Sequence, residues 1–135
     1  MVRVLEVGKC SPGLYIDMHD LSIDDSGARA LAQALSLGEC PPGLYLDLWG
    51  NDITAGGAQA LADAILSGQC PPRLQINIGE NNVTAEGMRA LAAAWGSEQS
   101  PSGLILMFEE GDYETLHGCR MFRGERTRIE PRKRR

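Results

Sequence analysis

Two sets of side chains that could bind a ligand recur 30 residues apart. The sets are Tyr15, Asp17 and His19 and, one period later, Tyr45, Asp47 and Trp49. Two carboxylates and an imidazole are donors that a metal ion could use, whereas large aromatic side chains are typical anchors of protein interfaces. Because aspartates that recur along a parallel sheet are more often solvated than bound to metal, the pattern favours an interface and no metal site.

The sequence offers little for catalysis. His117 and Cys119 lie close enough to suggest a base and a nucleophile, but no third group that would orient them is evident. There is no GxSxG or HExxH motif, and Gly8-Lys9-Cys10 lacks the glycine run of a phosphate-binding loop. We therefore predict that the protein is not an enzyme and uses no cofactor.

The elements that must position these side chains are repeats. Residues 10–39, 40–69 and 70–99 are three copies of one 30-residue unit, and 100–111 begin a fourth; the first two copies are identical at fourteen of thirty positions. Repeats of this period indicate a solenoid. Apolar residues alternate over 44–48 and then follow a helical spacing at Gly57, Leu61 and Ile65, which predicts a strand, a turn and a helix in each copy.

The ends of the helices can also be predicted. Asp24, Thr54 and Thr84 could each accept a hydrogen bond from the first helical turn, and paired prolines follow two of the helices. The glycine at 27, 57 and 87 should let each helix approach its strand. Strands stack about 4.8 Å apart and helices about 8–10 Å apart, so we predict a curved α/β solenoid of about three and a half repeats, with the parallel sheet on its concave face.

Outward-facing residues of successive strands should form columns on the concave face. The columns are Tyr15, Tyr45, Gln75 and Ile105; Asp17, Asp47, Asn77 and Met107; His19, Trp49, Gly79 and Glu109; and Asp20, Gly50, Glu80 and Glu110. They could simply cover the sheet. Alternatively, they bind a protein with a basic surface, selected by their carboxylates. The predicted contact residues are Tyr15, Asp17, His19, Tyr45, Asp47, Trp49, Gln75, Asn77, Glu80, Met107 and Glu109.

Residues 44–53 (LYLDLWGNDI) and 74–83 (LQINIGENNV) resemble the LxLxxNxL core of leucine-rich repeats. The segment GGAQALADAI is similar to the GxxxLAxAL helix of the ribonuclease-inhibitor-like class. This resemblance covers residues 10 to about 108. It implies that Asn51 and Asn81 hydrogen-bond backbone groups of neighbouring turns, and that the concave face is the binding surface. Leu21 takes the place of the asparagine in the first repeat, so the resemblance does not say how the backbone groups of that turn are bonded.

The Cys-Pro-Pro-Gly-Leu segment that opens the middle repeat, at residues 40–44, resembles repeats of secreted effector proteins of intracellular bacterial pathogens. This resemblance implies a partner that is a host protein or another effector. The expected location is the cytoplasm, or the cytosol of a host cell after secretion. The cysteines at 10, 40 and 70 should form a ladder of small buried thiols, which suits a reducing compartment.

Charge divides the chain into two parts. Residues 1–111, the predicted solenoid domain, hold 14 acidic and 5 basic side chains, and residues 112–135 hold 4 acidic and 8 basic ones. In the second part, Gly118 to Arg128 could form a hairpin within a C-terminal cap, and 131–135 are predicted to be disordered. Its arginines could bind the phosphates of nucleic acid or an anionic membrane, fold over the acidic body, or remain solvated.

The sequence at the first end of the solenoid is compatible with more than one assembly. Residues 2–8 align with the end of a preceding helix, so the chain is either a piece of a longer solenoid or covers its first strand with a partner. The oligomeric state does not follow from the sequence. The apolar runs are short, and residues 1–9 lack the apolar segment of a signal peptide.

Overall fold

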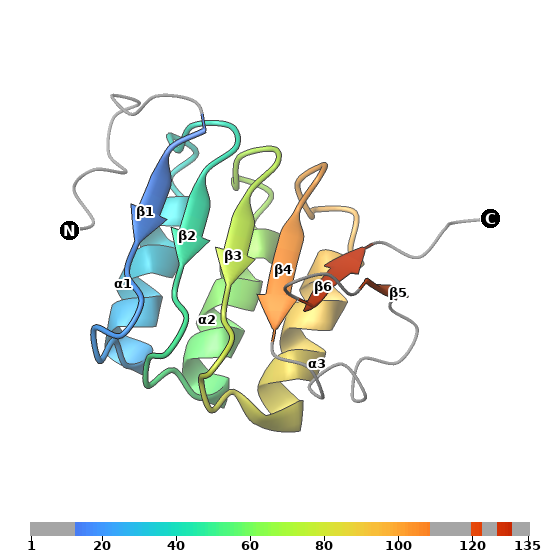
Figure 1. The fold of residues 1–135 in the computed structure, drawn as a ribbon. Coiled ribbons are helices and arrows are strands. Elements are labelled where there is room, and N and C mark those ends of the chain that lie inside the picture. Colours follow the sequence, from blue (N-terminus) through green and yellow to red (C-terminus); the bar gives the residue numbers. More distant parts are fainter. Residues whose placement is uncertain (1–12, 109–119, 123–126, 131–135) are drawn as a thin grey trace.

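The computed structural model describes residues 13–108, 120–122 and 127–130. Strands and helices alternate along the chain (Figure 1). They are β1 (Tyr15–Asp17), α1 (Asp25–Leu35), β2 (Tyr45–Asp47), α2 (Ala55–Leu66), β3 (Gln75–Asn77), α3 (Thr84–Trp95) and β4 (Ile105–Phe108), followed by β5 (Arg120–Phe122) and β6 (Thr127–Glu130). Within this part of the chain, no helix has the length and apolar character needed to cross a bilayer.

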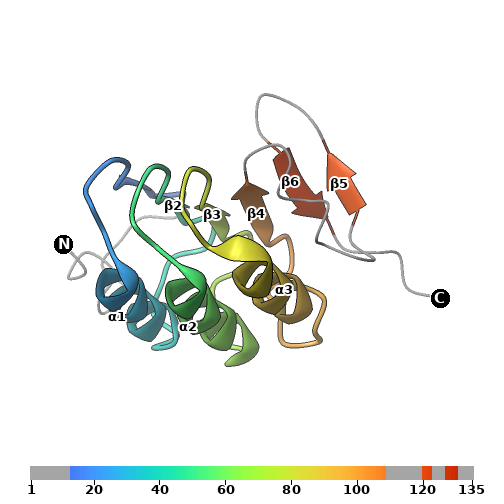
Figure 2. The ribbon, with the colours of Figure 1, turned by 90° about the horizontal axis from the view of Figure 1, so that it is seen from below.

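The first four strands form a parallel sheet in which each residue pairs with the residue 30 positions later. Tyr15 pairs with Tyr45, Tyr45 with Gln75, and Gln75 with Ile105. All three helices lie side by side on one face of this sheet (Figures 1 and 2). The predicted α/β solenoid is thereby confirmed, with its strands and helices in separate layers.

The core lies between the sheet and the helices. The inward residues of β2 and its flanks are fully buried, as are the apolar residues of α2 that face them. These residues are Leu44, Leu46, Leu48, Leu61 and Ile65. In the last layer Trp95 replaces the smaller helical residue, and its indole N–H donates to the carbonyl oxygen of Leu104 at 3.2 Å. The larger side chain is therefore buried without leaving its polar atom unpaired.

The capping prediction is correct only for the first helix. The Asp24 carboxylate accepts a hydrogen bond from the Gly27 N–H at 3.1 Å. Thr54 precedes α2 but makes no such bond; instead, its hydroxyl and its N–H donate to the two carboxylate oxygens of Asp25 at 2.5 and 2.7 Å. Thr84 lies inside α3, and its hydroxyl donates to the Val83 carbonyl. A threonine hydroxyl can donate as well as accept, so a nearby carbonyl or carboxylate competes with the helix.

Gly57 and Gly87 serve close packing between neighbouring helices, where the prediction was an approach of helix and strand; a methyl group at Gly27 would instead meet Ile23 Cγ2, just before its own helix. A methyl group at Gly57 would lie 2.6 Å from Ile53 Cγ2, two residues before α2 begins, and 3.0 Å from Ala28 Cβ in α1. At Gly87 it would lie 3.0 Å from Ala58 Cβ in α2. Gly57 and Gly87 therefore mark the points where α2 and α3 contact the preceding helix.

Asn51 joins two repeats, as the resemblance implied. Its Oδ1 accepts from the N–H groups of Leu21 and Ile23, both at 2.9 Å, and its Nδ2 donates to the Met18 carbonyl at 2.9 Å. Asn81 makes two equivalent bonds one repeat later, accepting from the Ile53 N–H at 2.9 Å and donating to the Leu48 carbonyl at 2.8 Å. The turn that lacks its own asparagine is thus completed by the asparagine of the following repeat.

An antiparallel hairpin continues the sheet beyond β4. Strand β6 pairs with β4 and with β5, so the sheet extends past the predicted boundary at residue 111. The predicted hairpin over 118–128 is confirmed as to its strands, although β6 runs on to Glu130. Residues 1–12, 109–119, 123–126 and 131–135 lie outside the described part, and with them the predicted hairpin turn, Cys10, Glu109, Glu110 and the basic end of the chain.

The cysteine prediction can be examined at two positions. Cys40 is half-buried and Cys70 is buried, each beside the end of the preceding helix. Burial raises the pKa of the Cys70 thiol to about 12, with a smaller contribution from the nearby Cys40. Such a thiol stays protonated and behaves as a small apolar side chain.

Candidate functional site

The candidate site is the sheet face that points away from the helices, which we call the open face. Strand register places the predicted columns side by side on it, including Asp17 beside Asp47, Asp47 beside Asn77, and Asn77 beside Met107. The geometry of the first two columns therefore follows the prediction, while the burial and the hydrogen bonds of their members differ from one strand to the next.

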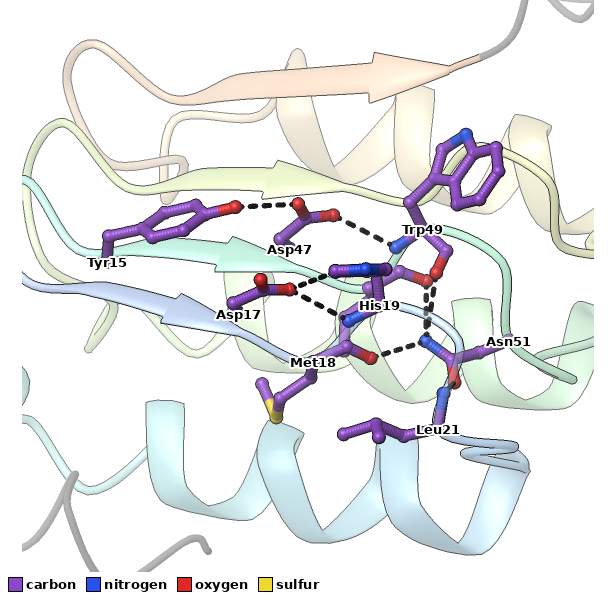
Figure 3. Close-up of polar contacts among 9 residues, drawn as sticks. Tyr15, Asp17, Met18, His19, Leu21, Asp47, Trp49 and Asn51 are labelled. Atoms are coloured by element: carbon purple, nitrogen blue, oxygen red, sulfur yellow. Dashed lines mark hydrogen bonds and ion pairs between the residues drawn. The ribbon is translucent and has the colours of Figure 1, made fainter.

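Aromatic side chains gather over β1 and β2. The rings of Tyr15 and Tyr45 meet edge to face, with centroids 4.8 Å apart and an angle of 89° between planes. Tyr15 is 50% exposed, and Tyr45 and Trp49 are half-buried. Figure 3 shows the Trp49 indole standing away from the sheet, beyond the strand end. Partly exposed, ordered rings of this kind offer apolar area without a large entropic cost on binding.

Asp47 is held within this surface. It is only 7% exposed, its Oδ2 accepts a hydrogen bond from the Tyr15 hydroxyl at 2.8 Å, and its Oδ1 accepts from the Trp49 N–H at 3.2 Å (Figure 3). The bond to the Asp47 carboxylate, together with burial, raises the pKa of Tyr15 to about 12. Asp47 therefore organises the face and presents little charge of its own.

Asp17 and His19 form the exposed charged pair of the face. Asp17 Oδ1 contacts His19 Nδ1 and also accepts from the His19 N–H at 3.2 Å. The two side chains are 45% and 49% exposed, respectively. The hydrogen bond between them raises the pKa of His19 and lowers that of Asp17. A protonated His19 thus neutralises the nearest accessible carboxylate.

The remaining predicted contact residues are less accessible. Asn77 and Met107 are buried at 5% and 6% exposure, and Gln75 is half-buried. Glu80 is exposed, at the turn after β3. The binding role of all these residues stays a prediction, but the accessible chemistry is concentrated on β1, β2 and the turns that follow them.

Leu21 is an exposed residue that sequence reasoning did not include. It is 54% exposed and lies in the turn after β1, where its N–H is bonded to Asn51 (Figure 3). Its position in the repeat could have predicted this, because Leu21 is an apolar residue at the turn position that asparagine occupies in the other repeats. Leu21 adds exposed apolar area in the turn after β1, on the α1 side of Asn51 (Figure 3).

The fold and the face define an α/β repeat protein with a one-sided parallel sheet. The family model described as Leucine Rich repeat matches residues 44–62 and 74–92, each spanning one strand and most of the following helix. These two segments are accordingly similar to leucine-rich repeats, and such repeats generally mediate protein–protein interactions and are usually non-catalytic. A search of curated proteins found no match.

Proposed function

We propose that the protein is a non-catalytic interaction module that binds a protein partner through the open face. The observation that carries this proposal is the Tyr15–Tyr45 pair, which is ordered by an edge-to-face contact and still leaves Tyr15 half exposed. Ordered aromatic side chains are frequent energetic anchors of interfaces. Trp49 and Leu21 extend the apolar area at the ends of the same two strands.

The proposed partner presents basic side chains. Asp17, Asp20 and Glu80 are exposed at or after the ends of the strands, and residues 1–111 hold 14 acidic against 5 basic side chains. Such a surface steers a basic partner by charge, while the aromatic centre supplies the apolar contact. Asp47 supports the interface indirectly by fixing Tyr15.

The proposed setting is the cytoplasm, or the cytosol of a host cell if the protein is a secreted bacterial effector. The Cys-Pro-Pro-Gly-Leu segment at residues 40–44 supports the effector role, in which the partner is a host protein or another effector. Reduced thiols such as the buried Cys70 suit this setting.

A pull-down from host and bacterial lysates tests the proposed interface. The intact chain is compared with a Tyr45→Ala, Trp49→Ala double variant and with an Arg29→Ala, Arg89→Ala double variant, whose changes lie on exposed positions of α1 and α3. We expect a protein retained by the intact chain and the helix variant but lost from the sheet variant. Circular dichroism confirms that both variants are folded.

The alternative function, binding of nucleic acid or an anionic membrane through the basic end of the chain, is separated by a third variant. Deleting residues from 120 onward would remove β5 and β6, so the four basic residues 132–135 are replaced by glutamine instead. Partner retention that survives the sheet substitutions and is lost with this replacement would contradict the open-face proposal.

A further inference from the structure

Three potential metal ligands converge where β1 and β2 lie side by side. One ligand atom from each of Asp17, His19 and Asp47 can be chosen so that all three lie within 4.8 Å of one another. His19 lies in the turn just after β1, where its Nδ1 contacts Asp17 Oδ1, and Asp47 is the register partner of Asp17. Figure 3 shows the three side chains on the same side of the sheet.

The spacing suits a small ion. Metal–ligand distances of about 2.0–2.2 Å place the ligands of a tetrahedral site about 3.3–3.6 Å apart, and the three ligand atoms here already lie within 4.8 Å of one another. Imidazole favours first-row transition metals such as Zn²⁺, whereas Ca²⁺ and Mg²⁺ prefer sites made of oxygen alone. One imidazole and two carboxylates therefore define a three-ligand site for a borderline ion, with a fourth position open.

The burial of Asp47 distinguishes this cluster from a group of solvated carboxylates on the surface. Asp47 is only 7% exposed. Its two carboxylate oxygens accept hydrogen bonds from the Tyr15 hydroxyl at 2.8 Å and from the Trp49 N–H at 3.2 Å. A carboxylate oxygen has about two acceptor positions, so each can still bind a metal while these donors orient it. Hydrogen bonds to a ligand are the usual support of a metal site.

Charge also favours a dication here. Asp17 and Asp47 are like charges on neighbouring strands, and direct cross-strand pairs of like charge are destabilising. His19 contacts Asp17, but it neutralises that carboxylate only when it is protonated. A divalent ion between the three groups would neutralise both carboxylates and bind the neutral imidazole.

We propose that Asp17, His19 and Asp47 bind one divalent first-row transition-metal ion, Zn²⁺ in particular, on the open face. Tyr15 is a positioning residue for this site through its bond to Asp47. This proposal does not depend on the proposed partner: the fourth position can be taken by water or by a side chain of a bound protein.

Isothermal titration of the full chain with ZnCl₂, under reducing conditions, measures the site. The ligand variants are His19→Ala and Asp17→Asn. The matched controls are His117→Ala, the other histidine of the sequence, and Asp63→Asn, an exposed carboxylate on α2. Because there are only two histidines, NMR of the imidazole Cε1–H groups assigns the ligand directly.

We expect one equivalent of Zn²⁺ bound by the intact chain and by both controls. Loss of an outer hydrogen-bond partner typically weakens metal binding by about 10–100-fold, so His19→Ala should weaken it at least that much. The His19 resonance should shift on addition of zinc, and this measurement on the intact chain stands even if a variant fails to fold.

Several results would overturn the site. Equal zinc affinity in His19→Ala and the intact chain would place the ion elsewhere, for example on cysteines. An equal loss in Asp63→Asn and Asp17→Asn would mean that zinc only senses net charge. Failure of the intact chain to bind zinc, or binding of Mg²⁺ with the same affinity and no dependence on His19, would also refute the proposal.

Discussion

Replacing Asn51 by alanine should cost more stability than any other single polar truncation on the turns. Its side chain is 7% exposed and makes four hydrogen bonds of 2.9 Å, to Leu21, Ile23, Met18 and Leu48. Each bond contributes about 0.5–1.5 kcal/mol, and a buried donor left unpaired costs about 1–3 kcal/mol. The Ile23 N–H is such a donor, whereas water can reach the exposed turn at Leu21. We expect the free energy of unfolding to fall by about 2–4 kcal/mol.

Urea denaturation followed by circular dichroism at equilibrium measures this loss. Asn82→Ala is the matched control, because the Asn82 side chain is exposed on a neighbouring turn, and it should change the free energy by no more than about 0.5 kcal/mol. If Asn51→Ala were as stable as Asn82→Ala, the bonds between repeats would not contribute as argued. An unchanged dependence of stability on urea concentration would show that the denatured state is comparable in the two variants.

Three further predictions concern the packing between repeats. The pKa of Asp25 is lowered, first by its hydrogen bond from the Thr54 hydroxyl and then by the Thr54 N–H; its stabilising contribution is therefore present above its unfolded pKa and lost as the pH falls through the folded one. Asp25→Asn should destabilise at pH 7, and its difference from the parent should shrink toward pH 3 in urea titrations. Gly57→Ala should destabilise by about 1–3 kcal/mol through overpacking. Gly56→Ala, at an exposed position of the same helix, should cost less, because its methyl group would lie 3.1 Å from the Asp25 carboxylate but would not meet the α1 backbone or Ala28; equal effects in thermal melts would contradict the helix contact. Because its pKa is raised to about 12, Cys70 should alkylate at pH 8 far more slowly in the native chain than in urea, as peptide mass spectrometry would reveal.

The sequence was sufficient to predict the columns of the open face. A 30-residue period in which each unit holds one strand requires residue 15 to lie beside 45 and residue 17 beside 47, and the observed register follows this rule. The prediction needed only the repeat length and the alternation of apolar residues. The burial of Leu44 to Leu48 on the inner side follows from the same alternation.

The contacts between side chains of different repeats were not predictable from the period. Thr54 resembles a helix cap in sequence, but its hydroxyl bonds Asp25 of the preceding repeat. Asp47 resembles an exposed acid, but Tyr15 covers it. Both outcomes depend on the lengths and rotamers of side chains that lie 29 and 32 positions apart, and an alternating pattern carries no information about these.

Identical residues of successive repeats therefore acquire different roles on the open face. The tyrosine of one strand reaches the aspartate of the next, so Tyr15 buries Asp47. Asp17 lies on β1, the edge strand of the described sheet, and remains 45% exposed beside His19. On the other side, the column continues with Asn77, whose Oδ1 accepts from the Gly79 N–H at 3.0 Å. In the column that contains Asp17, Asp47 and Asn77, accessible negative charge is thus confined to Asp17 at the β1 end, where a basic partner or a metal ion could bind.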